Sequence, residues 1–306
     1  MSTYVLRRTL HSAITLFGVS IVVFLILRVL PGDPARMMLP DGAPQTAVDE
    51  MNRQLGLQEP LYVQYGLFLS SVARLDFGQS FQFRVPATAV VSERVMPTVH
   101  LALCAFLITV AVGVPAGILA AAKRGTLFDY GSIFITALGQ SLPNFWLGIM
   151  LILTFGVALA WLPTSDYKGP SYLVLPSITL AAFPTALVAR LTRSSMLEVL
   201  SREYVRTARS KGLREITVVL GHAVKNAAIP VVTVLGLQIG VLLGGAVITE
   251  SVFAWPGVGK LVVDSIFRRD FPVVQTVLIL SATVFIIVNL LVDLTYTVLD
   301  PRIKYS

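Results

Sequence analysis

The stretch Thr9–Leu27, TLHSAITLFGVSIVVFLIL, runs for 19 residues without an aspartate, glutamate, lysine or arginine. The hydrocarbon core of a bilayer is about 30 Å thick, so a helix needs roughly 20 apolar residues to cross it. The segment is therefore predicted to span a membrane. Arg7 and Arg8 precede it, as they would in a signal peptide. However, the apolar run is long for one and no A-x-A cleavage site follows, which favours an uncleaved anchor.

Five further charge-free windows follow along the chain. They are Pro97–Ala122, Tyr130–Ser165, Gly169–Ala189, Asn226–Thr249 and Phe271–Val292. The window from Tyr130 is too long for one straight helix, and Pro163 is predicted to mark its exit. Pro176 and Pro184 predict a kink in the next window. Windows this long and this numerous do not suit the core helices of a soluble protein, so the predicted fold is an all-α membrane protein with six transmembrane helices.

The composition agrees with this fold class. Of 306 residues, 55% are apolar and 13% are charged, and the mean hydropathy is +0.77. Such a balance excludes a disordered chain, a coiled coil and most soluble enzymes. In so apolar a chain, the net charge of +7 indicates basic loops on one side of a membrane and not a nucleic-acid surface. The single cysteine, Cys104, excludes an intrachain disulfide and a thiolate metal cluster.

The basic residues predict the orientation. With six spans, the two termini and the loops after spans two and four lie on one side. That side carries Arg7, Arg8, Lys123, Arg124, Arg190, Arg193, Arg202, Arg206, Arg209, Lys211, Arg214, Lys225, Arg302 and Lys304, against Lys168, Lys260, Arg268 and Arg269 in the short loops opposite. Because basic short loops remain in the cytoplasm, both termini are expected there, in a cell (inner or plasma) membrane protein.

Three parts follow from this topology. Residues 1–30 form the N-terminal tail and first span, 31–96 an extracytoplasmic loop, and 97–306 a five-helix core with a cytoplasmic loop at 190–229. In the outer loop, Asp49–Leu57 and Glu59–Leu75 are predicted to form short helices. This loop is interpreted either as a solvated spacer or as a docking or gating element over an outer pore mouth.

The cytoplasmic loop has a strong helical pattern. Leu197, Leu200, Tyr204 and Ala208 recur at spacings of three and four and predict one apolar stripe, while Arg202, Arg206 and Arg209 fall on another face. Glu198 lies four residues before Arg202, which supports a helix. Gly212 is predicted to end the helix in a left-handed C-cap. A second stripe follows at Leu213, Ile216, Leu220 and Ala223. A short amphipathic helix of this kind must rest on lipid, on its own bundle or in a groove of another protein.

Four stretches of the chain carry a family resemblance. Glu203–Leu213, EYVRTARSKGL, resembles the cytoplasmic signature loop of permease subunits of ATP-binding-cassette (ABC) importers, in particular the B-type permease of the dipeptide, oligopeptide and nickel group. The others are RVLPGDPA at Arg28–Ala35, ESVFAWPGVG at Glu250–Gly259, and NLLVD at Asn289–Asp293 with LDPR at Leu299–Arg302. The resemblance runs from end to end and includes the long outer loop.

The resemblance implies that the signature loop is a coupling helix seated in a cleft of a cytoplasmic ATPase subunit. The residues implied in coupling are Arg202, Glu203, Tyr204, Arg206, Ala208, Arg209 and Gly212. The arginines would meet acidic or polar rims, Tyr204 and Ala208 would fill the groove, and Gly212 would allow a tight turn in which a Cβ would clash. The wider importer pattern has Glu-Ala-Ala where this chain has Arg206, Thr207 and Ala208, and a proline where it has Lys225. The glutamate's role is therefore not transferred.

The resemblance also implies partners and cargo. The partners are a second homologous permease, two cytoplasmic ATP-binding subunits or domains, an extracytoplasmic solute-binding protein and the surrounding lipid, with no nucleic acid. Short peptides are the implied substrate, and nickel or another small solute is the alternative. ATP and magnesium would bind to the partner ATPases, because Ala254–Leu261 is the nearest approach here to a P-loop and lacks its first glycine and final hydroxyl residue. The chain is expected to be non-catalytic.

Two other function classes can be weighed against the residues. An intramembrane serine protease could use Ser141 in the partial motif Gly139–Leu142, but His100 is the only candidate base. An ion-coupled transporter needs ionisable groups at mid-membrane, and the spans offer almost none. The polar residues Gln140, Asn144 and Gln238 could line a translocation path. The glycines of the Asn226–Thr249 window are better explained by close helix packing.

Overall fold

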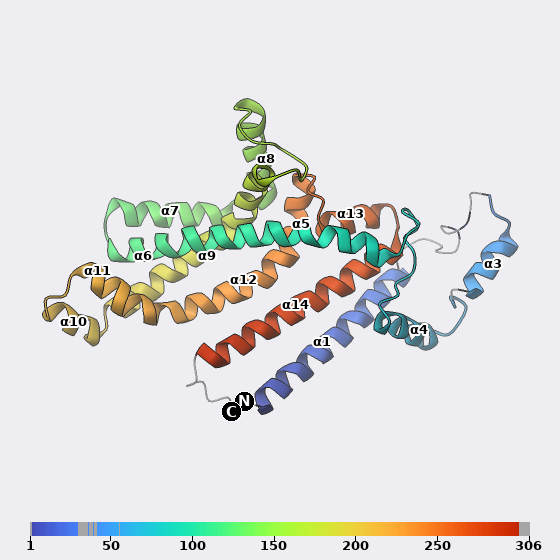
Figure 1. Ribbon diagram of the computed structural model, residues 1–306, viewed down its shortest axis with the longest axis horizontal. Helices are drawn as coiled ribbons and strands as arrows, with labels where there is room; N and C mark the ends of the chain where they lie inside the picture. The colour runs from blue at the N-terminus through green and yellow to red at the C-terminus, as the bar shows by residue number, and fades with distance from the viewer. Residues whose placement is uncertain (1, 30–35, 37–38, 40–41, 55, 300–306) are drawn as a thin grey trace. The chain divides into compact units, whose positions relative to one another are not determined.

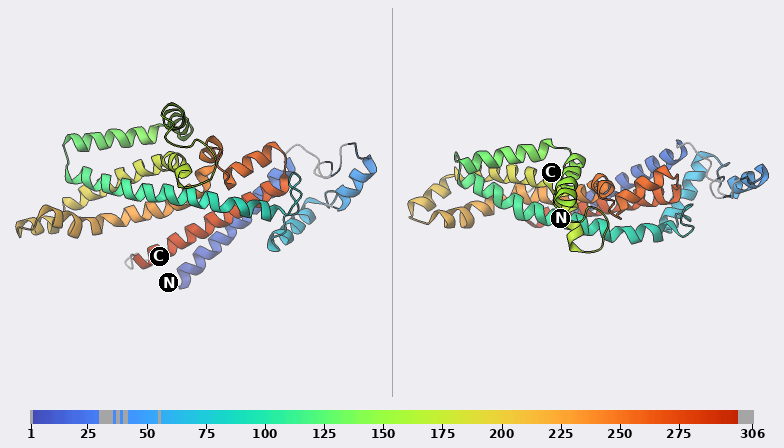
Figure 2. Two further views of the ribbon diagram at one scale, coloured as in Figure 1. Left: turned by 45° about the horizontal axis from the view of Figure 1, so that its top comes forward. Right: turned by 90° about the horizontal axis from the view of Figure 1, so that it is seen from above.

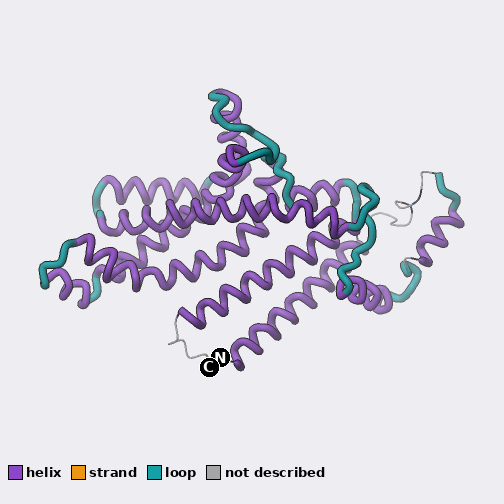
Figure 3. Tube along the Cα trace, viewed as in Figure 1, coloured by secondary structure: helices purple, strands orange, loops and turns teal. Residues whose placement is uncertain are grey.

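The computed structural model describes the chain except for residues 1, 30–35, 37–38, 40–41, 55 and 300–306 (Figure 1). Two of the stretches that carry the resemblance, around 30–35 and 299–302, fall mostly outside this description, as does the side chain of Asp293. Within the described residues every regular element is a helix (Figure 3). Among the described residues, five helices are long and apolar enough to cross a membrane, and a bent pair of helices brings the number to six when it is counted as one span. The predicted all-α membrane fold is confirmed.

The chain divides into two compact units. The described residues within 1–96 and 257–290 form the first unit, and those within 97–256 and 291–299 form the second.

The first unit contains the two helices that were predicted at the two ends of the chain. It is built from α1 (Ser2–Val29), α3 (Gln45–Gln54), α4 (Leu61–Ala73), the start of α5 (Ala87–Ile108), α13 (Val258–Phe267) and most of α14 (Phe271–Leu299). Phe24 of α1 and Phe68 of α4 are buried in its core, and the Ser20 and Tyr65 hydroxyls lie 2.8 Å apart. Helix α4 confirms the second helix predicted in the outer loop and shows that this part of the loop packs on its own chain.

Asp270 ties the outer segment around Ser80 to the start of α14. Its carboxylate accepts hydrogen bonds from the Ser80 hydroxyl and from the backbone N–H groups of Phe81 and Gln82, the latter two at 3.1 and 3.3 Å. Asp270 is only 1% exposed, so these donors provide the partners that a buried carboxylate needs.

The second unit is arranged around α9 (Pro170–Leu200). The unit consists of α5 with its π-helical continuation η1 (Thr109–Gly113) and α6 (Val114–Ala122), then α7 (Leu127–Ser141), α8 (Asn144–Leu151), η2 (Ile152–Ala158), α9, α10 (Glu203–Ser210), α11 (Glu215–Thr217), η3 (Val218–Ala223) and α12 (Val224–Val252). Helices α6, α7, α8 and α12 all contact α9. Figures 1 and 2 show α10 at the same end of this unit as the turn between α6 and α7.

The long window from Tyr130 breaks in its middle, at a bend that was not located in advance. Helices α7 and α8 meet at an angle of 104°. Leu142 is extended, with ψ 128°, because the ring of Pro143 disfavours a helical conformation in the residue before it. Pro143 is the N-cap residue of α8, which begins at Asn144. Pro163 lies beyond the end of η2, in the loop that leads to α9.

Gly117, which was not predicted to have a packing role, lies at a close contact between α6 and α9. A Cβ built on Gly117 of α6 would lie 2.5 Å from the Ala189 carbonyl oxygen and from the Thr192 Cβ of α9. Only glycine therefore allows α6 and α9 to approach this closely. In the window where glycine packing was predicted, Gly244 faces open space, with nothing within 4 Å of a Cβ.

Candidate functional site

The signature segment is a separate short helix and not a continuation of the preceding one. The predicted single stripe through Leu197, Leu200, Tyr204 and Ala208 is wrong, because α9 ends at Leu200 and α10 begins at Glu203. The Ser201 hydroxyl donates to the Glu198 carbonyl at 2.7 Å, which competes with the next helical turn. Arg202 is then extended, with ψ 149°.

The inner face of α10 rests on its own chain. Val205 is completely buried and Ala208 is 6% exposed, and both pack with Val218 and with Val199 and Leu200. Ala208 therefore supports the helix from beneath, and its side chain is not available to fill a partner's groove.

Tyr204 is exposed but also bonds to its own chain. Its ring is 43% exposed, and its hydroxyl accepts a hydrogen bond from the Asn226 side chain at 2.9 Å. Asn226 belongs to α12, so this bond joins α10 to the start of that long helix, while the apolar contacts join α10 to α9 and η3. The hydrogen bond to Asn226 is a direct side-chain contact between α10 and α12.

The outer face of α10 is charged and exposed. Arg206 bonds to Glu203 at 3.0 Å, Arg209 bonds to Glu215 at 2.6 Å, and Arg202 pairs with Glu198. The carboxylate of Glu215 raises the pKa of the Arg209 guanidinium above its usual range. Ion pairs this exposed contribute little to stability, so their side chains can exchange partners at low cost. This face has the chemistry of a surface for a polar or acidic partner.

Gly212 is required by backbone conformation. Its φ is +76°, and its N–H donates to the Arg209 carbonyl at 2.9 Å, so the predicted left-handed end of the helix is confirmed. The expected Cβ clash is wrong, because a Cβ at Gly212 would have nothing within 4 Å. The cost of a side chain here comes from the positive φ alone.

The second predicted stripe is also displaced. Leu213, Ile216 and Leu220 are 40%, 66% and 56% exposed, whereas Val218 and Val219 are buried. Leu213 and Ile216 lie before the π-helical turn η3, whereas Val218, Val219 and the fully buried Ala223 lie within it, where the helical period departs from 3.6 residues. The exposed residues Leu213, Ile216 and Leu220 follow α10 directly along the chain.

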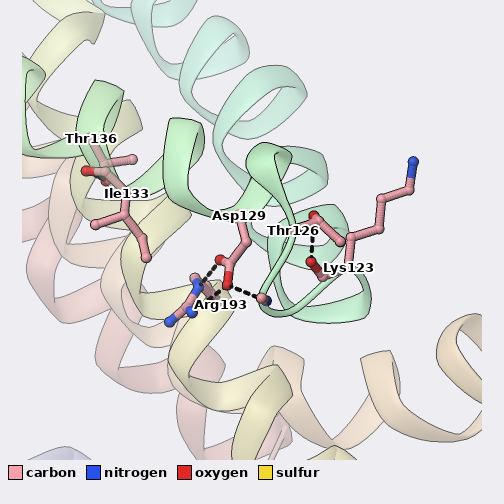
Figure 4. Close-up of polar contacts among 7 residues, drawn as sticks. Lys123, Thr126, Asp129, Ile133, Thr136 and Arg193 are labelled. Carbon is pink, nitrogen blue, oxygen red and sulfur yellow. Dashed lines mark hydrogen bonds and ion pairs between the residues drawn. The ribbon is translucent and has the colours of Figure 1, made fainter.

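A buried ion pair between α7 and α9 was not predicted. The Arg193 guanidinium donates to both carboxylate oxygens of Asp129, at 2.6 and 2.9 Å, and the Gly125 N–H donates to the same carboxylate at 3.0 Å (Figure 4). Asp129 is 2% exposed. Such a bidentate geometry holds both side chains in one orientation. The sequence signals were an acidic residue directly before the window Tyr130–Ser165 and two arginines just after the window Gly169–Ala189.

The three path candidates do not form a cluster. Gln140 and Asn144 are half-buried, on either side of the bend between α7 and α8, and Gln238 of α12 is 7% exposed. The buried amide nitrogen of Gln140 and the buried amide oxygen of Gln238 have no hydrogen-bond partner in the described structure. An unpaired buried amide is costly, so these two side chains are unusual for a packed helix interior. Their part in a path stays a prediction.

The protease alternative finds no support in the geometry. The Ser141 hydroxyl donates to the Ala137 carbonyl at 2.9 Å, and the His100 ring bonds to the Tyr167 hydroxyl. No hydrogen bond joins Ser141 to His100 in the part of the chain that the structure describes. The described residues also contain no group of three or more histidine, cysteine or acidic side chains that could hold a metal ion.

Comparison with known proteins places this arrangement in context. Residues 113–305 match the family described as binding-protein-dependent transport system inner membrane component, and residues 1–102 match the model for the N-terminal part of such components. The chain is 45% identical to the glutathione transport system permease protein GsiC of Escherichia coli K12, over 100% of both chains. It is 40% identical to the dipeptide transport system permease protein DppB of Alkalihalophilus pseudofirmus, again over 100% of both chains.

Solved structures share the fold at lower identity. An inward-facing MetNI methionine ABC transporter chain matches with a TM-score of 0.59 at 17% identity, covering 70% of this chain and 97% of that one. A chain of an amino acid ABC transporter crystallised with histidines matches with a TM-score of 0.53 at 17% identity, covering 71% and 95%.

Proposed function

The chain belongs to the family of binding-protein-dependent transport system inner membrane components, and on that premise we propose that it forms, with a second homologous permease, the path by which short peptides enter the cell. It is a permease subunit of an ABC importer, a multi-pass protein of the inner membrane. The path would lie at the interface of the two permeases, because a six-helix bundle alone cannot easily surround a peptide. Gln140, Asn144 and Gln238 are the residues we assign to it.

The observation that supports coupling is the two-faced character of α10. One face is buried on the chain through Val205 and Ala208, and the other exposes Arg202, Glu203, Arg206 and Arg209. A helix fixed on one side and polar on the other can transmit the motion of a separate motor as a rigid body. We assign the motor to two cytoplasmic ATP-binding subunits or domains. They would bind ATP and magnesium, and this chain would itself be non-catalytic.

The remaining topology follows from the same assignment. Both termini and α10 would lie in the cytoplasm, and residues 31–96 outside, where an extracytoplasmic solute-binding protein would deliver the cargo. The basic residues of the cytoplasmic segments support this orientation.

The substrate class is supported by the relatives, whose names specify glutathione and dipeptides. A short peptide is therefore favoured, and nickel or another small solute is the second candidate. The test is the ATPase activity of the assembled importer in liposomes with its binding protein, measured with di- to pentapeptides, glutathione and Ni²⁺. Stimulation by peptides and uptake of the same peptides would support the proposal. Stimulation by Ni²⁺ alone would favour the second candidate, and uptake driven by an ion gradient without ATP would contradict coupling to a motor.

A further inference from the structure

A cavity of about 260 Å³ lies between α7 and α9, beside the buried ion pair. Its wall on the α7 side includes Ser132, Ile133 and Ala137, and its wall on the α9 side includes Arg190 and Arg193. Figure 4 shows Ile133 on the helix that carries Asp129, facing the region of the Arg193 side chain. The cavity therefore combines the hydroxyl groups of Ser132 and Thr136 with apolar side chains and two guanidinium groups.

The two arginines of the cavity differ in whether a carboxylate neutralises their charge. Arg193 is neutralised by the bidentate contact with Asp129. Arg190, almost one turn earlier on α9, is exposed and has no hydrogen bond or ion pair to any described residue. The cavity therefore carries one net positive charge that the chain does not compensate, and this charge favours an anionic ligand.

The position of Arg190 along α9 places the cavity at the edge of a bilayer. The helix begins at Pro170, and 20 residues at 1.5 Å each span about 30 Å, the thickness of the hydrocarbon core. Arg190 follows directly after such a length. On the neighbouring α7, Phe134 and Ile135 are 64% and 68% exposed, as side chains that meet acyl chains would be. A basic pocket at this depth between transmembrane helices is suited to a lipid headgroup.

We propose that this cavity binds the phosphate of an anionic phospholipid in the cytoplasmic leaflet. Arg190 pairs with the phosphate, and the Ser132 hydroxyl donates a hydrogen bond to one of its oxygens. Ile133 and Ala137 contact the first carbons of the acyl chains. A free phosphate ion shares the charged contacts but gains nothing from this apolar wall, which favours the lipid. The site is independent of the substrate and of the motor contact on α10.

Native mass spectrometry of the purified importer complex tests the proposal. The complex is delipidated and then given phosphatidylglycerol or phosphatidylcholine with identical acyl chains, with and without inorganic phosphate. The wild-type complex is expected to retain phosphatidylglycerol in preference to phosphatidylcholine. Arg190→Gln should lower that retention about fivefold, the effect of one basic residue at an anionic membrane surface. Arg190→Lys should restore most of it.

Two further variants distinguish lipid binding in the cavity from a general effect of positive charge on the cytoplasmic side. Lys225→Gln removes an exposed cation elsewhere on the same basic side and should leave retention unchanged. Ala137→Phe fills the cavity while Arg190 remains, and should lower retention although the net charge is unaltered. Equal retention of the two lipids, or an Arg190→Gln complex that retains phosphatidylglycerol normally, would overturn the site. Displacement of the lipid by inorganic phosphate would assign it to the free ion. A photoreactive residue at 137 that attaches only to another polypeptide would show that a protein covers it.

Discussion

The second unit holds arginine–carboxylate pairs in two different settings. Asp129 and Arg193 join α7 to α9, with the aspartate side chain 3% exposed and the arginine side chain 24% exposed. Glu203 and Arg206 on α10 are 85% and 68% exposed. Burial removes water and fixes the first pair, whereas solvent screens the second and leaves its groups free to change partners. The same chemistry can therefore serve as an internal tie in one place and as a contact surface in another.

The buried pair should give the largest effect when one partner is neutralised. Asp129→Asn leaves the Arg193 guanidinium beside a neutral amide in a mostly buried site, which is expected to cost about 3 kcal/mol of stability. The measurement is thermal unfolding of the purified complex in detergent, followed by tryptophan fluorescence. The double variant Asp129→Leu with Arg193→Met removes both charges and should recover much of the loss. A single variant as stable as the wild type would show that the pair is not an internal tie.

The buried contact beneath α10 should give the next largest effect. Ala208→Glu places a carboxylate among Val205 and Val218, and the unfavourable burial should detach α10 at a cost of roughly 2 kcal/mol. Peptide-stimulated ATPase activity should fall with it, because a detached helix no longer passes motion to the bundle. Thr207→Glu is the matched control, since Thr207 is the exposed neighbour of Ala208. If both variants lower the unfolding midpoint alike, α10 is not held by this contact.

Gly212 should give a smaller effect, limited to backbone strain. Gly212→Ala keeps the space around the residue free but places a Cβ at a φ of +76°, which should cost about 1 kcal/mol. Gly212→Asn should cost less, because asparagine adopts the left-handed conformation more readily. Unfolding midpoints in the order glycine, asparagine, alanine would support this explanation. An asparagine variant less stable than the alanine variant would point to a steric cause instead.

The contrast between the two settings also explains what could be predicted from the sequence. Membrane spans depend on local composition, so charge-free windows such as Thr9–Leu27 located them correctly. The left-handed end of α10 could be predicted because Gly212 follows a short amphipathic pattern. The Asp129–Arg193 tie could not, because the two residues are far apart in sequence and hydropathy carries no pairing information. The π-helical turn η3 was missed for a related reason, since an inserted residue is fixed by packing and leaves the composition unchanged.

The smallest effect on stability should come from the exposed pair. Its substitution should instead change the binding of another subunit, which distinguishes it from the buried pair. Arg206→Glu breaks the contact with Glu203 and should change stability by less than about 0.5 kcal/mol, because solvent screens both groups. The same substitution reverses the charge on the face that we assign to the ATPase subunits, so those subunits should be lost during co-purification. Lys168→Glu is the matched control: it breaks another exposed pair, with Asp166, in a loop on the opposite side of the predicted membrane. It should leave the ATPase subunits bound. An Arg206→Glu complex that keeps them would mean that the exposed arginines of α10 face only water or lipid, and the proposed coupling role of this face would be wrong.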